Sequence, residues 1–274
     1  MAASPPQIVA AADRDSSRVR DVAVVVPDRP ISATSEVGRI AAAPGGSLLG
    51  ALLIMGEEND RRRQLINAAQ KRAEANAAPV RDALTSIDLG SLAMTTTEQA
   101  LAETSWLTPG TIRRLDKGTD EAIASFAADA SSDQIALIRY RYELSPDCSQ
   151  IRIIADVQLM PASNSAAPLY EASVAAITEL QMRTFEPSEN GVRWGDEGGW
   201  RARYAVEDGF RRLAVLIPRL LHLSESDLAR YRRKSEPKAF GAGFNGTLIV
   251  RSDDQLLIWA DGLVSIGRVP ATAP

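Results

Sequence analysis

The stretch DQIALIRYRYELSPDCSQIRIIADVQLM, residues 133–160, predicts the centre of the fold. Apolar and aromatic residues alternate with polar ones on both sides of a Ser-Pro-Asp turn, and a period of two is what a half-buried antiparallel strand requires. Pro146 and Asp147 favour the turn, because Pro presets φ and Asp can bond its own backbone. We therefore predict a long β-hairpin with these residues facing inward: Ile138, Tyr140, Tyr142, Leu144, Ile151, Ile153, Ala155, Val157 and Leu159.

The opposite face of this hairpin is polar and carries a row of arginines, Arg139, Arg141 and Arg152. Glu143, Asp156 and Gln158 alternate with the same apolar residues. The arginine row suits contact with an acidic partner, and it fits equally well the ordinary solvated face of an antiparallel sheet.

Composition places the chain among soluble globular proteins. Its 274 residues are 45% hydrophobic and 24% charged, and this length allows a sizeable core. Residues 1–18 are rich in Ala, Ser, Pro and Asp and predict a disordered tail, which leaves residues 19–270 as a single domain. The predicted fold class is α+β, with an antiparallel sheet of five to seven strands and helices packed on one face.

Helical periodicity is strongest in residues 57–87, where an apolar stripe recurs at three- and four-residue steps. Pro79 should kink this helix or start a new one, and Asp88 begins its predicted stop. A second helix is expected at 95–106 with Thr97 as its cap. The other predicted elements are a helix opening at 119–121, a helix at 200–223, a strand at 18–26 and a three-stranded meander within 246–269. Residues 169–180 allow a helix or a strand, and we favour a strand that pairs beside the hairpin.

Charge and residue usage exclude several classes of function. The net charge of −4 gives no field for a polyanion, so we expect no nucleic-acid partner. Cys148 and His222 are the sole cysteine and histidine, so the usual Cys/His zinc site cannot be assembled. We expect neither a metal nor a cofactor, and no nucleophile–base pair is visible.

Residues 40–56 form an unusually apolar segment that includes Leu48, Leu49 and Leu52. Pro44 and several glycines interrupt it, and it is shorter than the roughly 20 apolar residues of a membrane span. Either the fold buries this segment or a partner protein or a membrane surface covers it. We favour burial within the fold, and the alternative is docking of a partner or peripheral membrane contact through residues 40–56.

The best candidate ligand site is the glycine-rich stretch 191–199, which we interpret as a loop. Asp196 and Glu197 lie in it as paired carboxylates, with Trp194 and Trp200 on either side. Tryptophans next to acidic groups can hold sugars or cations. Acidic residues before a helix N-terminus are also common for electrostatic reasons alone, so that both interpretations stand.

The order of these parts resembles a known group of proteins. The segments RDVAVVV, GGSLLGALL, APVRDAL, SW, LSPDCSQIRIIADVQL and LLIWADGLVSIGR are together similar to uncharacterised envelope proteins and lipoproteins of Gram-negative bacteria. The resemblance extends from about Arg18 onward and brings no catalytic residues with it. It implies an extracytoplasmic protein, periplasmic or associated with the outer membrane, although the N-terminal stretch lacks the charged start and apolar core of a signal peptide.

These observations predict a non-enzymatic protein of the bacterial cell envelope that binds or scaffolds another envelope protein. The predicted partner-binding residues are the arginine row and the leucines of residues 40–56. The alternative prediction is a hydrolase or carbohydrate-binding enzyme that uses the Asp196/Glu197 loop.

Overall fold

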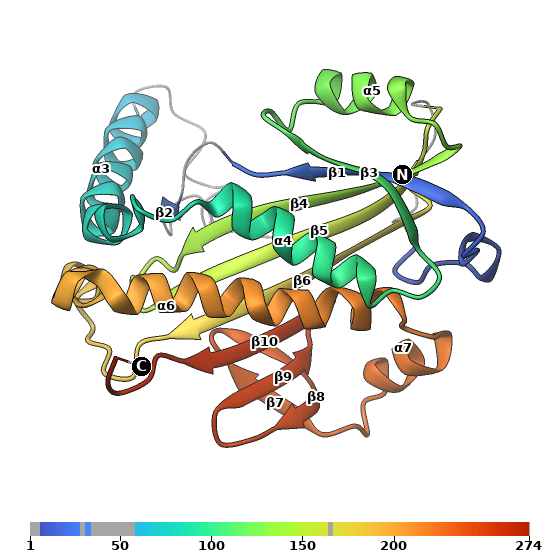
Figure 1. Ribbon diagram of the computed structural model, residues 1–274. Coiled ribbons are helices and arrows are strands. Elements are labelled where there is room, and N and C mark those ends of the chain that lie inside the picture. The colour runs from blue at the N-terminus through green and yellow to red at the C-terminus, as the bar shows by residue number, and fades with distance from the viewer. Residues whose placement is uncertain (1–5, 28–30, 34–57, 164–166, 274) are drawn as a thin grey trace.

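The computed structural model describes residues 6–27, 31–33, 58–163 and 167–273, which form an α+β fold (Figure 1). The segment 40–56, with Leu48, Leu49 and Leu52, lies outside the described residues. Its burial, and its contact with a partner or a membrane, therefore stay predictions.

The predicted hairpin is confirmed as the centre of the sheet. Strands β4 (Gln134–Leu144) and β5 (Gln150–Pro161) are antiparallel, and Tyr140 lies opposite Ala155. Tyr140 is buried, its hydroxyl lies 2.9 Å from Thr97 Oγ1, and its ring centroid lies 5.5 Å from that of Phe210. All nine residues predicted to face inward are buried.

The rest of the sheet differs from the prediction of five to seven antiparallel strands, which is wrong. Nine strands lie side by side in the order β3-β1-β4-β5-β6-β10-β9-β8-β7, and a short β2 pairs with β4. The sheet is mixed, because the pairs β1–β3, β1–β4, β2–β4 and β6–β10 are parallel. The additional strands are β1 (Val19–Val25), β2 (Ser32–Ala33), β3 (Thr108–Leu115), β6 (Tyr170–Glu179), β7 (Lys238–Gly241), β8 (Phe244–Arg251), β9 (Gln255–Trp259) and β10 (Leu263–Arg268).

Helices lie on both faces of the sheet, so the prediction of one covered face is also wrong. Helices α4 (Leu89–Ala102) and α6 (Pro187–Leu221) cross one face, as Figure 1 shows, and α7 (Glu225–Arg232) follows α6. Helix α5 (Asp120–Asp129) packs Ile123 and Phe126 on the opposite face. The apolar run of β1 is the cause: alternate residues of this strand are buried on each face, as is typical of a parallel strand.

Helix α4 begins earlier than predicted. The Asp88 carboxylate accepts a 3.0 Å hydrogen bond from the Ser91 amide and caps a helix that starts at Leu89. The sequence Asp88-Leu89-Gly90 is therefore a helix start where a stop was expected. Thr97, the predicted cap, lies inside the helix and is buried beside Tyr140.

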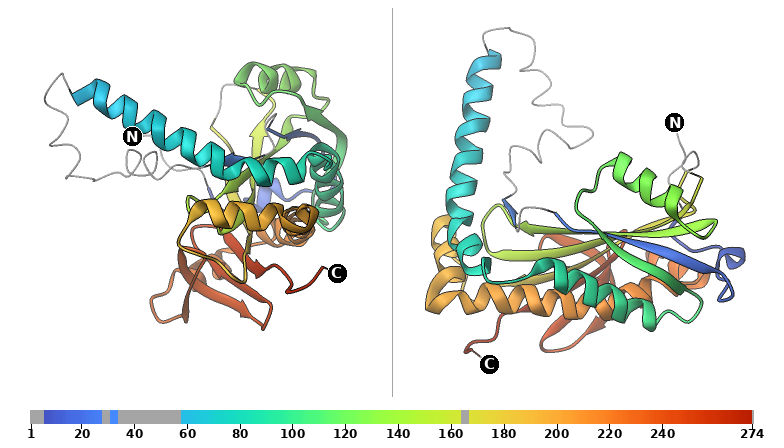
Figure 2. Two further views of the ribbon diagram at one scale, coloured as in Figure 1. Left: turned by 90° about the vertical axis from the view of Figure 1, so that its left-hand side faces the viewer. Right: turned by 45° about the horizontal axis from the view of Figure 1, so that its top comes forward.

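Helix α3 (Glu58–Leu84) runs through Pro79 as one element and packs on α6. Its buried residues Ala77, Val80 and Leu84 all belong to the predicted apolar stripe. Figure 2 shows the N-terminal end of α3 extending away from the sheet and its covering helices.

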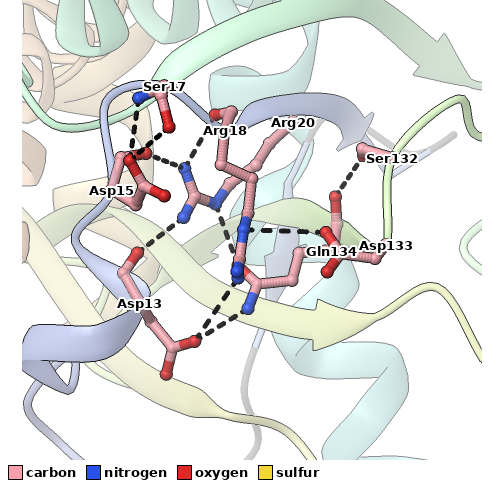
Figure 3. A network of polar contacts seen from close by, with 8 residues as sticks. All are labelled: Asp13, Asp15, Ser17, Arg18, Arg20, Ser132, Asp133 and Gln134. Carbon is pink, nitrogen blue, oxygen red and sulfur yellow. Dashed lines mark hydrogen bonds and ion pairs between the residues drawn. The ribbon is translucent and has the colours of Figure 1, made fainter.

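Residues 6–18 belong to the fold, which corrects the predicted tail for this part of the chain. The buried Arg20 side chain fixes them (Figure 3): Nη2 donates to Asp13 O at 2.6 Å, and Nε donates to Gln134 Oε1 at 3.1 Å. Gln134 Nε2 in turn donates to Asp13 Oδ1 at 2.7 Å. A buried charge is tolerated when its hydrogen bonds are satisfied, and this network ties the N-terminal segment to β4.

Candidate functional site

A polar strip crosses the face of the sheet that α4 and α6 leave uncovered. We use this name for Arg139 and Arg141 of β4, Asp156 of β5 and Ser173 of β6. The sheet register places Arg139 opposite Asp156, and Asp156 opposite Ser173. Apolar clusters border the strip, one with α5 and the other with β9 and β10.

Asp156 is the central acceptor of the polar strip. Arg141 donates to it through two nitrogens, at 2.8 Å from Nε and 3.1 Å from Nη2, and the Ser173 hydroxyl donates to the same carboxylate. Arg141 also contacts Glu143 at 3.0 Å. The hydrogen bonds to Asp156 hold the pKa of Arg141 above its ordinary value. Asp156 thus pairs with Arg141, which lies diagonally across the two strands, and not with Arg139, which lies directly opposite.

Arg139 is the exception within the polar strip. Its side chain is half-buried and its Nε atom is shielded from solvent without an acceptor. Within the described ranges it forms no hydrogen bond or ion pair through its guanidinium group. The shielded Nε–H group is a costly donor, because it has lost water and has gained no acceptor in return.

Arg152, the third predicted arginine, is not on a solvated surface. Only 7% of it is exposed, because the β7–β8 hairpin curls over this end of β5. Arg152 Nη2 donates to Gln150 Oε1 at 2.7 Å and to Ala242 O at 3.3 Å, and its guanidinium lies 5.4 Å from the centre of the Phe244 ring. Its role is to hold the curled hairpin against the sheet, so the row predicted for partner contact contains two arginines and not three.

The predicted glycine loop 191–199 is mostly helical. Helix α6 starts at Pro187, and only residues 196–199 depart from helical geometry. Glu197, Gly198 and Gly199 have φ values of 53°, 74° and 77°, so three successive residues are left-handed. The left-handed region costs a non-glycine residue energy, and Glu197 is the residue that bears this strain.

Hydrogen bonds at the break hold the Glu197 carboxylate. It accepts from Trp200 Nε1 at 2.7 Å and from Arg201 Nη2 at 3.0 Å. These two bonds, that from Trp200 above all, lower the pKa of Glu197 below its ordinary value. A carboxyl group with a lowered pKa is ionised at neutral pH, which is opposite to what a general acid needs. The structure brings Asp196, Glu197 and Trp200 together at the surface of this break.

Trp194 cannot join them as a stacking platform, because it is fully buried. Its indole Nε1 donates a 2.7 Å hydrogen bond to the carbonyl oxygen of Cys148 in the hairpin turn. The inward position follows from the helix that residues 187–195 form, which directs this side chain into the core. Trp194 is therefore a core residue, and its predicted contact with a ligand is not possible in this structure.

The glycines of this stretch serve helix packing. A Cβ atom on Gly191 would lie 2.1 Å from Asn76 O, one on Gly195 would lie 3.0 Å from Pro79 Cβ, and one on Gly199 would collide with Ala83. We call these three glycines and the facing part of α3 the glycine notch. The spacing of four residues places Gly191 and Gly195 along one side of the helix, and it was the signal in the sequence for close helix contact, whereas Gly199 lies in the break that follows.

A groove of about 560 Å³ lies beside the break, between the first turns of α6 and residues 269–271. Leu180, Met182, Val192, Val269 and Pro270 supply apolar lining. The charged lining consists of Glu189, Arg193, Asp196, Glu197 and Arg201. A second, shallower hollow of about 510 Å³ shares Val192 and Asp196 with this groove and reaches Pro79 and Ala83 of α3.

A larger cavity of about 1070 Å³ lies at a different place, between residues 6–14, the start of β6 and α7. Its lining mixes Arg14 and Arg232 with Glu171, Glu225 and Asp261. Of the predicted ligand- and partner-binding residues that the structure describes, none lines this cavity.

Sequence reasoning missed the exposed apolar residues near the groove. Met182, Phe185 and Val192 are large side chains, and residue type alone predicts that they are buried. Asn190 was missed as well. It is fully buried, and its amide orders the connection between β6 and α6.

The described residues contain neither a candidate metal site nor a candidate membrane-spanning helix. No group of three or more His, Cys, Asp or Glu side chains there has the proximity that a metal ion needs. No helix within the same ranges combines the length and apolar character that crossing a membrane requires.

Comparison of the chain with protein-family models, with curated proteins and with solved structures found no significant match.

Proposed function

We propose that this protein is a non-enzymatic binding module of the bacterial cell envelope, and that its polar strip binds an acidic surface of another envelope protein. The observation that carries the proposal is Arg139, a half-buried guanidinium on a central strand without an anion among the described residues.

The neighbouring groups explain why the missing anion would come from outside. Asp156, the carboxylate opposite Arg139, is already bound by Arg141 and Ser173. A partner carboxylate can bind a guanidinium through two parallel hydrogen bonds, and such charge-assisted pairs are among the stronger polar contacts in proteins. Binding would then remove a cost that the free protein bears.

The setting of Arg139 also suits recognition. It lies on a hydrogen-bonded sheet, where the backbone has little freedom to lose when a partner binds. Arg141 is 48% exposed at its side chain and offers a second basic group at the edge of the same strip. An acidic partner gains both specificity and association rate from such complementarity.

The cell-envelope part of the proposal is supported by the resemblance of the chain to Gram-negative envelope proteins. This part of the proposal states that the protein is periplasmic or associated with the outer membrane. Fractionation of the source bacterium, with an antibody against this chain, tests it: recovery with the cytoplasmic proteins alone would reject the location.

The alternative function, a hydrolase or carbohydrate-binding enzyme at Asp196 and Glu197, stays a prediction. We prefer the binding module for two physical reasons. Glu197 is engaged by Trp200 and Arg201, and Trp194 is buried. Glu197, whose pKa is lowered, is a poor proton donor, and one of the two expected stacking surfaces is missing.

Photo-crosslinking in the source bacterium tests the proposed partner. Benzoylphenylalanine replaces Glu143, beside the polar strip, and in a control chain it replaces Arg251, an exposed residue of β8. We expect position 143 to crosslink to an envelope protein and position 251 not to do so. Arg139→Gln should reduce the crosslink about tenfold, the factor that corresponds to one lost charge-assisted bond.

Stability measurements separate this result from misfolding. Because Arg139→Gln removes a shielded Nε–H donor that has no acceptor, the variant should unfold at the same urea concentration as the wild type or a higher one. An undiminished crosslink in a folded Arg139→Gln protein would overturn the proposal.

A further inference from the structure

A second surface of the molecule has the features of a protein docking site. It lies at the connection between β6 and α6, where Met182 is 76% exposed, Val192 is 51% exposed and Phe185 is fully exposed. Met182 and Val192 line the groove of about 560 Å³ described above. Single exposed apolar residues are ordinary, as Val215 and Phe240 illustrate in this chain, but three within eleven positions beside a groove mark an interaction surface.

The connection that carries Phe185 is fixed and not a loose loop. Asn190 Oδ1 accepts a 2.9 Å hydrogen bond from the Thr184 amide, and Asn190 Nδ2 donates to Thr184 O at 2.9 Å and to Asp147 O at 2.8 Å. The Glu186 amide donates to Thr184 Oγ1 at 3.2 Å. The backbone before Phe185 is thus bonded to a buried amide, and the backbone after it is bonded to the Thr184 hydroxyl. An aromatic side chain held in solvent by ordered backbone loses little entropy on binding, which is the property of an interface anchor.

The charges of the groove indicate what kind of segment it accepts. Glu197 and Arg201 neutralise each other at 3.0 Å, and Arg193 donates to the carbonyl oxygen of Met182 at 2.8 Å. Glu189 and Asp196 line the same groove, and neither has an ion pair with another described residue. Two carboxylates therefore remain available beside an apolar floor.

We propose that this groove docks an apolar segment of another protein, and that a lysine or arginine of this segment binds Glu189 and Asp196. Phe185, Met182 and Val192 supply the apolar contacts, and the carboxylates fix orientation by complementarity of charge. The site is separate in residues and in sign of charge from the polar strip. A protein with both surfaces holds two partners at once, which is what a scaffold does.

Selection from a phage-displayed library of random dodecapeptides, with the full chain as bait, provides the probe. The expected consensus has at least two large apolar residues and one Lys or Arg. A peptide synthesised from that consensus should bind Phe185→Ser and Val192→Ser roughly tenfold more weakly than the wild type, as is usual for loss of an anchor. The matched controls are Phe240→Ser and Val215→Ser, whose parent residues are 73% and 70% exposed at other places. These two should bind within about twofold of the wild type.

A separate double variant tests whether Glu189 and Asp196 bind the basic residue of the peptide. Glu189→Gln combined with Asp196→Asn should weaken the consensus peptide and reduce the dependence of binding on salt, because screening acts on exposed charges. All six replaced residues are exposed, so circular dichroism should detect no unfolding.

Three results would overturn the inference. They are the absence of any enriched consensus, a consensus without basic residues, and equal losses in the test and control variants. A peptide whose binding depends on Arg139 and not on Phe185 would reject this docking site while leaving the function proposed for the polar strip intact.

Discussion

Trp194 Nε1 donates a 2.7 Å hydrogen bond to the carbonyl oxygen of Cys148, so the first turns of α6 are tied directly to the turn of the central hairpin. Both residues are buried, and Cys148 adopts a left-handed φ of 53° that presents its carbonyl to the indole. Trp194→Phe keeps an aromatic ring but leaves this carbonyl oxygen without a donor. We expect a loss of about 1–3 kcal/mol in the free energy of unfolding, measured in urea. Trp200→Phe in the same helix is the control and should cost less, because Trp200 is half-buried and its indole donates to the exposed Glu197 carboxylate.

The facing of strand β4 gives a second prediction. Tyr140 lies in the core between Thr97 and Phe210, so Tyr140→Asp places a charge where no cation can pair with it. The expected loss is on the order of 3 kcal/mol or more. Arg141→Ala, one residue along the strand and on the opposite face, should cost under about 1 kcal/mol because its ion pairs are half-exposed. Equal losses for the two variants would mean that the strand faces the other way.

Asp21 predicts a dependence of stability on acid. Burial would raise the pKa of this carboxyl, but hydrogen bonds from the Ser131 and Thr111 amides outweigh burial and leave it below the ordinary value of 3.8. A carboxylate with a lowered pKa in the folded protein contributes stability above the ordinary pKa and loses it as the pH falls further. Asp21→Asn should therefore cost about 2 kcal/mol at pH 7, where charged hydrogen bonds are lost.

The difference between Asp21→Asn and the wild type should shrink as the pH falls below 3.8. Urea unfolding at a series of pH values measures it. A difference that stays constant from pH 7 to pH 3 would contradict the role given to the ionised carboxylate.

The glycine notch predicts how α3 is attached. Gly191→Val directs a branched side chain at the backbone of Asn76, where even a Cβ atom has no room. We expect amide hydrogen exchange in residues 77–84 to accelerate by at least roughly tenfold, since local opening becomes easier. Exchange in β4 and β5 should change little. Val192→Ser alters the next residue, which is exposed, and protection of α3 should survive this change.

Local patterns in the sequence predicted individual helices and strands, but they did not predict which distant segments contact each other. Alternation in β4 and β5 reflects burial of one face, so that the hairpin could be read from residues 133–160 alone. The same kind of pattern does not identify a strand's neighbour, and β1 was therefore not placed between β3 and β4. Strand β3 lies at an edge with mostly exposed side chains, which is why it gave no apolar signal.

The candidate site was predictable in part. Asp196, Glu197 and Trp200 do lie together, because they are close in the chain. Gly191, Gly195 and Gly199 were interpreted as a loop because glycine breaks isolated helices. Here contact with α3 stabilises the helix that contains Gly191 and Gly195, and only Gly199 lies in the break. Arg152 was expected in solvent, and only the curl of β7 and β8, a long-range feature, buries it.

The glycines of the notch contact α3 near its C-terminal end, so that the N-terminal part of this helix extends beyond the contact. Residues 58–75 of the helix precede the notch and span about 27 Å at 1.5 Å per residue. A rigid rod held at one end amplifies rotation, so a tilt of about 10° at Asn76 carries the far end through roughly 5 Å. A rotation of α3 about the glycine notch would therefore move its first residue, Glu58, much farther than it moves Asn76.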